Sequence, residues 1–177
     1  MFDNILYPTD GSDGADAVIA YARTLAEMYE ATVHLLFVVD AEHVESGMMV
    51  RRDDDGNWVT GMTRRSQETA GSGSMSRNPE MREILEREGE ELTAEVSRSL
   101  AQDGIETITQ VKYGDPAQVI TDYASDNGID LIVMGTHGRR GLRRRLIGSV
   151  TETVIRTTEV PVLTARLTES EAERTDR

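Results

Sequence analysis

Short apolar runs alternate with stretches of helical periodicity along most of the chain. The runs are apolar or β-branched and end at turn-forming residues, which predicts strands. They cover residues 2–7, 32–39, 105–111, 129–134 and 160–165. Between them, apolar residues recur every three or four positions in segments that begin near Ser12, Pro79, Pro116 and Ser149. Asn78-Pro79 and Asp115-Pro116 predict two helix starts, and Gly104 and Gly128 predict two helix ends.

Residues 40–78 interrupt this pattern. They contain three consecutive aspartates, two Arg pairs and the run Gly71-Ser72-Gly73-Ser74. Their apolar residues do not recur with a helical or strand period. A connection of this length in a compact domain is usually functional or disordered. We interpret it as a long, partly mobile loop within a single domain over residues 1–167, followed by a polar tail over residues 168–177.

The regular alternation of strands and helices predicts an α/β fold. Right-handed crossovers give a five-stranded parallel sheet with helices on both faces. Such sheets bind ligands at the carboxyl ends of their strands, where the strand order reverses. Two segments are therefore candidates for a binding site: Pro8-Thr9-Asp10 after the first strand, and residues 135–149 after the fourth.

Composition and charge narrow the class of protein. The chain has 177 residues, no cysteine, 19 Lys and Arg against 32 Asp and Glu, and a net charge of −13. No apolar run approaches the ~20 residues that cross a bilayer, and no secretory signal is found. We expect a cytoplasmic protein that binds neither membranes nor nucleic acid, because its acidic surface repels both.

The acidic surface also suggests that the protein works at high salt concentration. Lys112 is the only lysine, and carboxylates take the place of other long side chains. Salt screens the mutual repulsion of these carboxylates. We interpret the composition as that of a halophilic, archaeal-type cytoplasmic protein. An ordinary acidic mesophilic protein is the alternative.

The most informative motif follows the fourth predicted strand. Gly135-Thr136-His137-Gly138 is followed by nine residues and then by Gly148-Ser149. Glycines let a backbone approach a ligand closely, and a helix that starts here offers its amides and its dipole to phosphates. The alternative is a glycine-rich turn without a ligand, because the Gly-Lys-Ser/Thr of a Walker loop is absent.

This spacing resembles the nucleotide-binding signature of the universal stress protein family, which reads Gly, two residues, Gly, nine residues and Gly-Ser/Thr. Residues 5–12 resemble the first strand and acidic turn of that family, residues 148–152 its last helix and residues 160–163 its last strand. The resemblance implies a Rossmann-like, adenine nucleotide alpha hydrolase-like fold with strand order 3-2-1-4-5. Because the signature is complete, it also implies the ATP-binding branch of the family.

The resemblance implies a set of ATP contacts. Asp10 would approach the ribose, and the backbone of Val38 would meet the adenine. The remaining implied contacts lie at the strand end, the phosphate turn and the helix start: Met134, Gly135, Gly138, Gly148, Ser149, Val150 and Thr151. Mg²⁺ is expected with the ATP, since it usually travels with phosphates and takes few protein ligands. No metal ligand is assigned.

Five arginines gather in the loop between the two glycine pairs, at positions 139, 140, 143, 144 and 145. Guanidinium groups bind phosphate oxygens well, so these side chains could contact the phosphate tail. The alternative is a solvated loop in which they pair with nearby carboxylates. A nucleic-acid patch is disfavoured, because no aromatic residues are interleaved with the arginines.

We expect an ATP-binding, nucleotide-dependent regulator or signalling module in a stress response. It would act as a homodimer through its last strand. That strand is an apolar edge of the sheet, and Pro161 is the only residue on it that would hinder pairing with a strand of another copy. No catalytic residue is assigned. The alternative is a slow ATP-hydrolysing or self-phosphorylating enzyme of the same fold, with Ser149 or Thr151 as the nearest hydroxyl.

Two other classes of α/β protein are disfavoured. A pyrophosphatase-type relative would carry Ser-Gly-Gly-x-Asp-Ser after the first strand, where this chain has Thr9-Asp10-Gly11-Ser12. A phospho-receiver domain would end its third strand in a phosphorylatable aspartate, where this chain has Lys112-Tyr113-Gly114.

Overall fold

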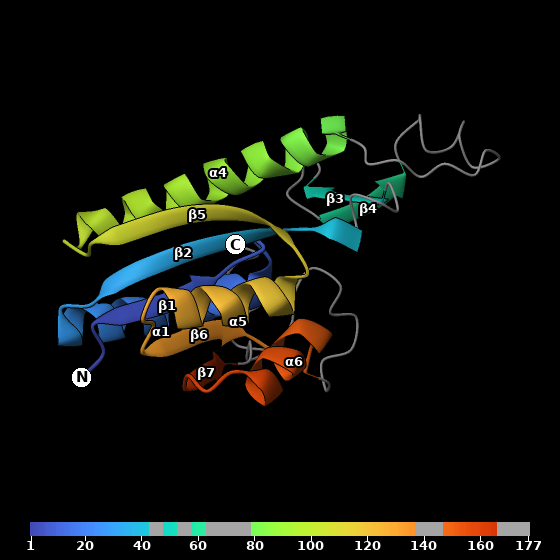
Figure 1. Cartoon of the computed structure of the whole chain (residues 1–177). Coiled ribbons are helices and arrows are strands. Elements are labelled where there is room, and N and C mark those ends of the chain that lie inside the picture. The colour runs from blue at the N-terminus through green and yellow to red at the C-terminus, as the bar shows by residue number, and fades with distance from the viewer. Residues whose placement is uncertain (43–47, 53–57, 63–78, 137–146, 166–177) are drawn as a thin grey trace.

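Five parallel strands form the central sheet of the protein. The computed structural model describes residues 1–42, 48–52, 58–62, 79–136 and 147–165. The sheet strands are β1 (Asn4–Pro8), β2 (Thr32–Asp40), β5 (Thr107–Gly114), β6 (Leu131–Gly135) and β7 (Val162–Ala165). They lie in the order β5-β2-β1-β6-β7 (Figure 1). Numbered along the chain within the sheet, this is the order 3-2-1-4-5, so the predicted fold is confirmed.

Helices cover both faces of this sheet. The two helices α1 (Asp13–Tyr29) and α4 (Pro79–Gln102) pack on one face, against Ile5, Val33 and Leu35. The other two, α5 (Pro116–Asp126) and α6 (Ser149–Thr157), lie side by side on the opposite face, against Leu6 and Leu36 (Figure 1). Each fully buried aliphatic side chain contributes about 1.5–3 kcal/mol. Because both faces are covered there, the inner strands β1, β2 and β6 are nearly continuous apolar runs, whereas the edge strand β5 also carries exposed polar residues.

Local signals set the helix ends. The Asp115 carboxylate accepts a hydrogen bond from the Gln118 N–H at 2.9 Å, and Pro116 follows it, so the predicted start of α5 is confirmed. Gly104 and Gly128 have φ of +77° and +60° just after α4 and α5, the left-handed backbone that favours glycine. Asn78, the predicted cap of α4, lies outside the described residues. None of the described helices is both long and apolar enough to cross a membrane.

An antiparallel hairpin lies within the stretch predicted to be a long loop. In it β3 (Met48–Arg52) pairs with β4 (Trp58–Met62), with Val50 opposite Thr60. The sequence analysis missed this hairpin because each strand spans only five residues and neither shows a clean alternation.

The strand β2 is one residue longer than predicted, and β5 begins and ends later than predicted. The strand β5 continues from the predicted end at Val111 to Gly114, because it pairs with β2 as far as Asp40. Pairing with a neighbour, rather than the apolar pattern, sets the end of this strand.

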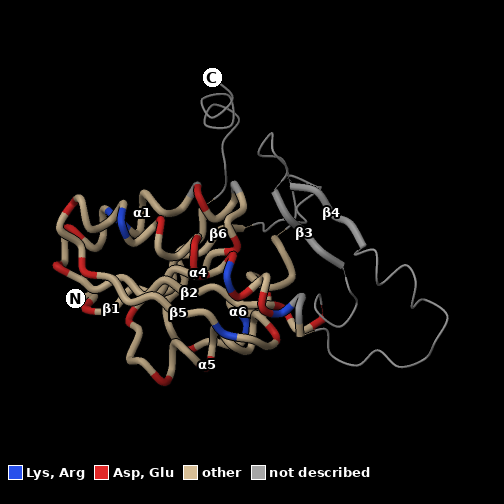
Figure 2. Tube along the Cα trace, turned by 90° about the horizontal axis from the view of Figure 1, so that it is seen from above, with Lys and Arg blue, Asp and Glu red and all other residues tan. Residues whose placement is uncertain are grey.

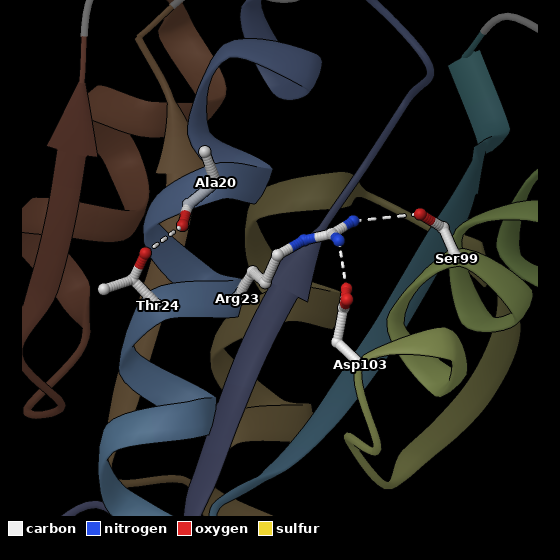
Figure 3. Close-up of polar contacts among 5 residues, drawn as sticks. All are labelled: Ala20, Arg23, Thr24, Ser99 and Asp103. Atoms are coloured by element: carbon white, nitrogen blue, oxygen red, sulfur yellow. Dashed lines mark hydrogen bonds and ion pairs between the residues drawn. The ribbon is translucent and has the colours of Figure 1, made fainter.

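A polar contact ties α1 to α4 on their shared face. The Arg23 guanidinium forms an ion pair with Asp103 and donates a hydrogen bond to the Ser99 hydroxyl at 2.9 Å (Figure 3). About a third of each charged side chain in the pair remains exposed, so its contribution to stability is below about 1 kcal/mol. The contact orients the two helices, while the apolar core holds them on the sheet.

Candidate functional site

The Asp10 turn leaves the carboxyl end of the central strand β1. The Thr9 N–H donates to the Leu36 carbonyl at 2.9 Å, and the Thr9 hydroxyl accepts from the Gly11 N–H at 3.1 Å. The Asp10 carboxylate accepts from the Ser12 N–H at 3.1 Å, and Gly11 has a φ of +70°. These bonds hold the half-buried Asp10 at the sheet edge, directly before the start of α1.

The end of β6 touches the start of α1. A Cβ atom on Gly135 would lie 2.3 Å from the Gly14 carbonyl oxygen and 2.6 Å from its carbon, so only glycine fits at this position. The segment after the fourth sheet strand therefore contacts the first turn of α1, which follows closely after the Pro8-Thr9-Asp10 segment. They meet where the strand order reverses, the usual ligand position in such sheets.

Two hydrogen bonds fasten the start of α6 onto the end of β6. The Gly148 N–H donates to the Thr136 carbonyl at 2.7 Å, and the Thr151 hydroxyl donates to the Gly135 carbonyl at 2.8 Å. Thr151 is buried. Because its hydroxyl is already bonded to the protein, any contact of Thr151 with a ligand would be made by its backbone N–H.

Among the described residues, no side chain caps the N-terminus of α6. Ser12 caps α1 and Asp115 caps α5, but α6 begins after Gly148, which makes no side-chain cap hydrogen bond. The first N–H groups of a helix have no partner within the helix, and they carry the positive end of its dipole. Glu152 in the first turn is paired with Arg156 at 2.8 Å. The start of α6 can therefore accept an anion.

The other predicted contacts take different positions around this edge. Pro8 at the end of β1 pairs with Leu36, so Val38 lies beyond the end of β1 on the longer strand β2. The Met134 side chain is buried in the core between the sheet and α5, which leaves only its backbone for a ligand. Val150 is half-buried and Ser149 is exposed. Gly138, His137 and the five loop arginines lie outside the described residues.

The sequence analysis did not single out Tyr7 or Thr136, which also belong to this region. Thr136 is buried, and its carbonyl holds the start of α6; its place inside the glycine signature was the available signal. Burial raises the pKa of the Tyr7 hydroxyl, the adjacent Thr9 side chain lowers it, and the Asp16 and Asp10 carboxylates raise it. Within the described residues, no group of three or more His, Asp or Glu side chains could hold a metal ion.

A second polar cluster occupies the opposite, amino edge of the sheet. The buried His34 shares a hydrogen bond of 2.9 Å between its Nδ1 and the Tyr123 hydroxyl, and its Nε2 lies 3.3 Å from the Asn4 side-chain oxygen. Burial lowers the pKa of His34. The Asp130 carboxylate accepts from the N–H groups of Asn4 and Asp3, which hold its pKa below the ordinary value. Each of these polar side chains therefore has a hydrogen-bond partner at the amino edge.

The fold defines a class: a doubly wound parallel α/β domain, with the candidate ligand site at the switch point of its sheet. The chain belongs to the universal stress protein family, whose model matches residues 1–166. It is 31% identical over 166 residues to universal stress protein MJ0531 of Methanocaldococcus jannaschii, an alignment that covers 94% of this chain and 83% of that protein.

Solved structures agree with this assignment. The structure of MJ0577, also from M. jannaschii, superimposes with a TM-score of 0.73 and 27% identity, over 96% of this chain and 99% of that chain. More distant structures share the fold: a universal stress protein in complex with cAMP (17% identity, TM-score 0.54) and an Arabidopsis thaliana family protein with AMP bound (15% identity, TM-score 0.51).

Proposed function

We propose that this protein is an ATP-binding universal stress protein that acts as a nucleotide-dependent regulator or signalling module. The observation that carries the proposal is the N-terminus of α6, which has no side-chain cap among the described residues and starts at the end of β6, the strand next to β1 and its Asp10 turn at the switch point of the sheet. Binding of cAMP and AMP by two distant structures of the same fold supports an adenine nucleotide as the ligand. We place the protein in the cytoplasm, where ATP is abundant.

Each part of the site would recognise one part of the nucleotide. The N–H groups at the start of α6 would bind phosphate oxygens, and the Asp10 carboxylate would accept ribose hydroxyls. The backbone of Val38 would meet the adenine, and the backbone of Met134 and Gly135 would line the crevice. Mg²⁺ would be held mainly by the phosphates, because the described residues offer no metal cluster.

The acidic character of the chain makes cations necessary at the phosphate end. Asp10, Asp16 and Glu152 all lie near the proposed crevice or in the first turn of a helix that lines it. Their negative charges oppose the binding of a triphosphate. Mg²⁺ and the loop arginines at positions 139–145 would offset that repulsion, which assigns the arginine cluster to the phosphate tail.

Calorimetric titration tests the proposal. ATP, ADP and tripolyphosphate are titrated into the wild type and into Asp10→Asn. Asparagine keeps an oxygen for the Ser12 N–H but places an NH₂ donor where ribose hydroxyls need an acceptor. We expect about a tenfold to hundredfold loss of ATP affinity with tripolyphosphate unaffected. The absence of nucleotide binding by the wild type would contradict the proposal. Mass spectrometry of nucleotide released by denaturation supplies an independent check.

Self-phosphorylation is the alternative activity, and of the two hydroxyls considered for it, at Ser149 and Thr151, the exposure of Ser149 favours that residue. The Thr151 hydroxyl is buried and donates to the Gly135 carbonyl, whereas Ser149 is exposed at the start of α6. Incubation with γ-labelled ATP would therefore label Ser149 and spare a Ser149→Ala variant. If no label is incorporated by the wild type, the protein binds ATP without transferring its phosphate.

We further propose a homodimer through β7. Among the described strands, β7 pairs only with β6, so one of its edges is open to a second copy. The exposed side chains of Tyr21 and Met28 lie seven residues apart on α1, nearly opposite Arg23, which contacts α4. They therefore flank the β7 side of the sheet. Sedimentation of the wild type at micromolar concentration should give a dimer, and Met28→Glu should weaken it.

Adaptation to high salt is the last part of the proposal. The chain carries a net charge of −13, and acidic residues are spread over all sides of the described trace (Figure 2). Their mutual repulsion destabilises the folded state until salt screens it. We expect the thermal midpoint to rise from dilute buffer to molar KCl, as measured by circular dichroism. Equal midpoints over that range would contradict a halophilic protein.

A further inference from the structure

The side chains of Asn4, His34 and Tyr123 join three elements at the amino edge of the sheet. His34 lies on β2, Asn4 is the first residue of β1, and Tyr123 belongs to α5. The His34 ring is buried, and the Tyr123 ring packs edge-on against it with 5.8 Å between the ring centres. Leu6 and Ile108 lie opposite His34 on the neighbouring strands. We call these three side chains, Asn4, His34 and Tyr123, the His34 cluster.

The partners of the His34 ring determine where its proton lies. The Asn4 side-chain N–H donates to the Gly128 carbonyl at 3.4 Å, so the Asn4 side-chain oxygen faces His34 as an acceptor. The Nε2 atom of His34 lies 3.3 Å from that oxygen and therefore carries a proton. In the neutral ring Nδ1 then keeps its lone pair, which accepts the Tyr123 O–H at 2.9 Å. The neutral Nε2–H form thus uses both of its nitrogen atoms.

A second proton on the ring would disturb this arrangement. It would turn Nδ1 from an acceptor into a donor, and the Tyr123 oxygen would have to accept the bond that its hydroxyl now donates. Among the described residues, His34 is the only hydrogen-bond partner of that hydroxyl. The hydroxyl proton would lose its acceptor inside the core, which destabilises the folded state.

The charged and titratable groups around the ring do not favour a second proton either. On α5, Tyr123 stays neutral, because burial raises its pKa. On β5, the Lys112 ammonium lies 5.7 Å from the centre of the Tyr123 ring, and its positive charge opposes another one. On β1, Asn4 is uncharged, and the Asp130 carboxylate before β6 is bonded to two backbone N–H groups. Burial itself lowers the pKa of His34.

We propose that the His34 cluster is an acid-sensitive switch, which holds β1 and α5 to β2 while the imidazole is neutral and weakens when the solution supplies a second proton. The imidazole binds that proton better when the cluster opens and the ring reaches water, so acid favours opening. Above about pH 6.5, the ordinary pKa of histidine in the unfolded chain, the stabilisation is complete. It is lost as the pH falls from there toward the lower pKa of the folded protein, where the loss ends.

His34→Gln tests the switch. Glutamine offers an N–H donor for Asn4 and an oxygen acceptor for Tyr123, but it does not titrate. Urea denaturation between about pH 7.5 and 5.5 gives the unfolding equilibrium constants of both proteins. The constant of the wild type, divided by that of the variant, should rise by up to about tenfold per pH unit below 6.5. Carboxylates common to the two proteins largely cancel in this ratio, and a ratio independent of pH would overturn the proposal.

His43→Gln is the matched control, because it makes the same chemical change at another of the three histidines. It should keep the pH dependence of the wild type, and loss of that dependence would overturn the assignment to His34. Hydrogen exchange locates the effect. Between about pH 7.5 and 5.5, the α5 amides of the wild type should lose protection relative to those of His34→Gln. Equal changes in the two proteins would contradict an opening at α5.

Nitrogen NMR of the wild type tests the same proposal even if His34→Gln does not fold. At about pH 7.5 the His34 ring should show a protonated Nε2 and an unprotonated Nδ1. As the pH is lowered, the ring should take up its second proton below about pH 6.5. An Nδ1–H form, or a titration at or above that pH, would overturn the proposal. The nucleotide site at the opposite edge of the sheet is independent of either result.

Discussion

The two edges of the central sheet handle their polar groups in opposite ways. At the amino edge, His34, Tyr123, Asn4 and Asp130 hydrogen-bond to one another or to neighbouring backbone. At the carboxyl edge, the N-terminus of α6 has no side-chain cap and the Tyr7 hydroxyl has no partner within the described residues. Both edges adjoin the same apolar core, so burial alone does not explain the difference.

We interpret the groups at the amino edge as stabilising the fold, and those at the carboxyl edge as belonging to the proposed ligand site. Unsatisfied buried groups destabilise a protein and are rare unless something else supplies the missing partner. At the carboxyl edge, the polar groups without partners lie near Gly135, where close packing requires a glycine. The comparison predicts that substitutions at the amino edge change stability, whereas those at the carboxyl edge also change nucleotide affinity.

Gly135→Ala should have the largest effect on stability. The new Cβ atom would lie 2.3 Å from the Gly14 carbonyl oxygen, so the backbone of β6 or α1 must move. We expect a loss of about 3 kcal/mol in the free energy of unfolding, the upper part of the range for overpacking. Urea denaturation measures it.

Gly128→Ala at the amino edge is the control for Gly135→Ala. Nothing lies within 4 Å of the position where its Cβ would be, so it suffers only the strain of a φ of +60°. That strain is about 1 kcal/mol. Similar losses for the two variants would show that the contact between β6 and α1 is not tight.

Gly148→Asp should have the next largest effect, and its two consequences have opposite signs. The new carboxylate would cap α6, which adds a few tenths of a kcal/mol to stability. It would also occupy the N–H groups proposed for phosphate and repel the ligand. We expect ATP affinity to fall about a hundredfold, which corresponds to about 2.7 kcal/mol. Calorimetric titration and thermal denaturation measure the two effects.

Asp115→Ala, at the start of α5, is the matched control for Gly148→Asp. It removes a cap that the structure shows in use, with the Gln118 N–H at 2.9 Å. It should therefore lower stability by about 1 kcal/mol and leave ATP affinity unchanged. If Gly148→Asp retained wild-type affinity, the phosphate would not bind at α6.

Asp130→Ala should have the smallest effect, and the effect should depend on pH. The N–H groups of Asn4 and Asp3 lower the pKa of Asp130, so its charged form stabilises the folded state. We expect a loss of about 1 kcal/mol at pH 7. This contribution is complete above about pH 4, the ordinary pKa in the unfolded chain, and vanishes as the pH falls through the folded pKa.

Asp126→Ala controls for the change in net charge. Asp126 is an exposed carboxylate at the end of α5. Its removal makes the same change in net charge and should leave the free energy of unfolding at pH 7 nearly unchanged. Urea denaturation at pH 7 and pH 2.5 gives the comparison, and an Asp130→Ala effect that persists at the lower pH would contradict its electrostatic origin.

Most of the strand and helix pattern could be predicted from local signals. The Asp115-Pro116 start of α5 and the left-handed glycines after α4 and α5 depend only on neighbouring residues. The hairpin of β3 and β4 was missed, because its short strands carry no clear period. The last three residues of β5 were missed because pairing with β2 holds them in the sheet.

The candidate site was predicted only in outline. The glycine signature and the acidic turn pointed to the carboxyl edge, and the family resemblance supplied the strand order that joins them. The contact of Gly135 with Gly14 and the bond from Thr151 to the Gly135 carbonyl bring together residues from different elements. No local pattern contains such distances, so these features could not be foreseen.

The class of fold and the position of the candidate site along the chain could be predicted from the sequence alone, because hydrophobic period, caps and glycine positions act over a few residues. Tertiary structure alone decided which polar groups are satisfied. His34 and Tyr123 lie 89 residues apart and pair, whereas Tyr7, in a strand of similar composition, is left without a partner among the described residues. Hydrogen bonds form over about 3 Å, so the packing of distant segments determines them.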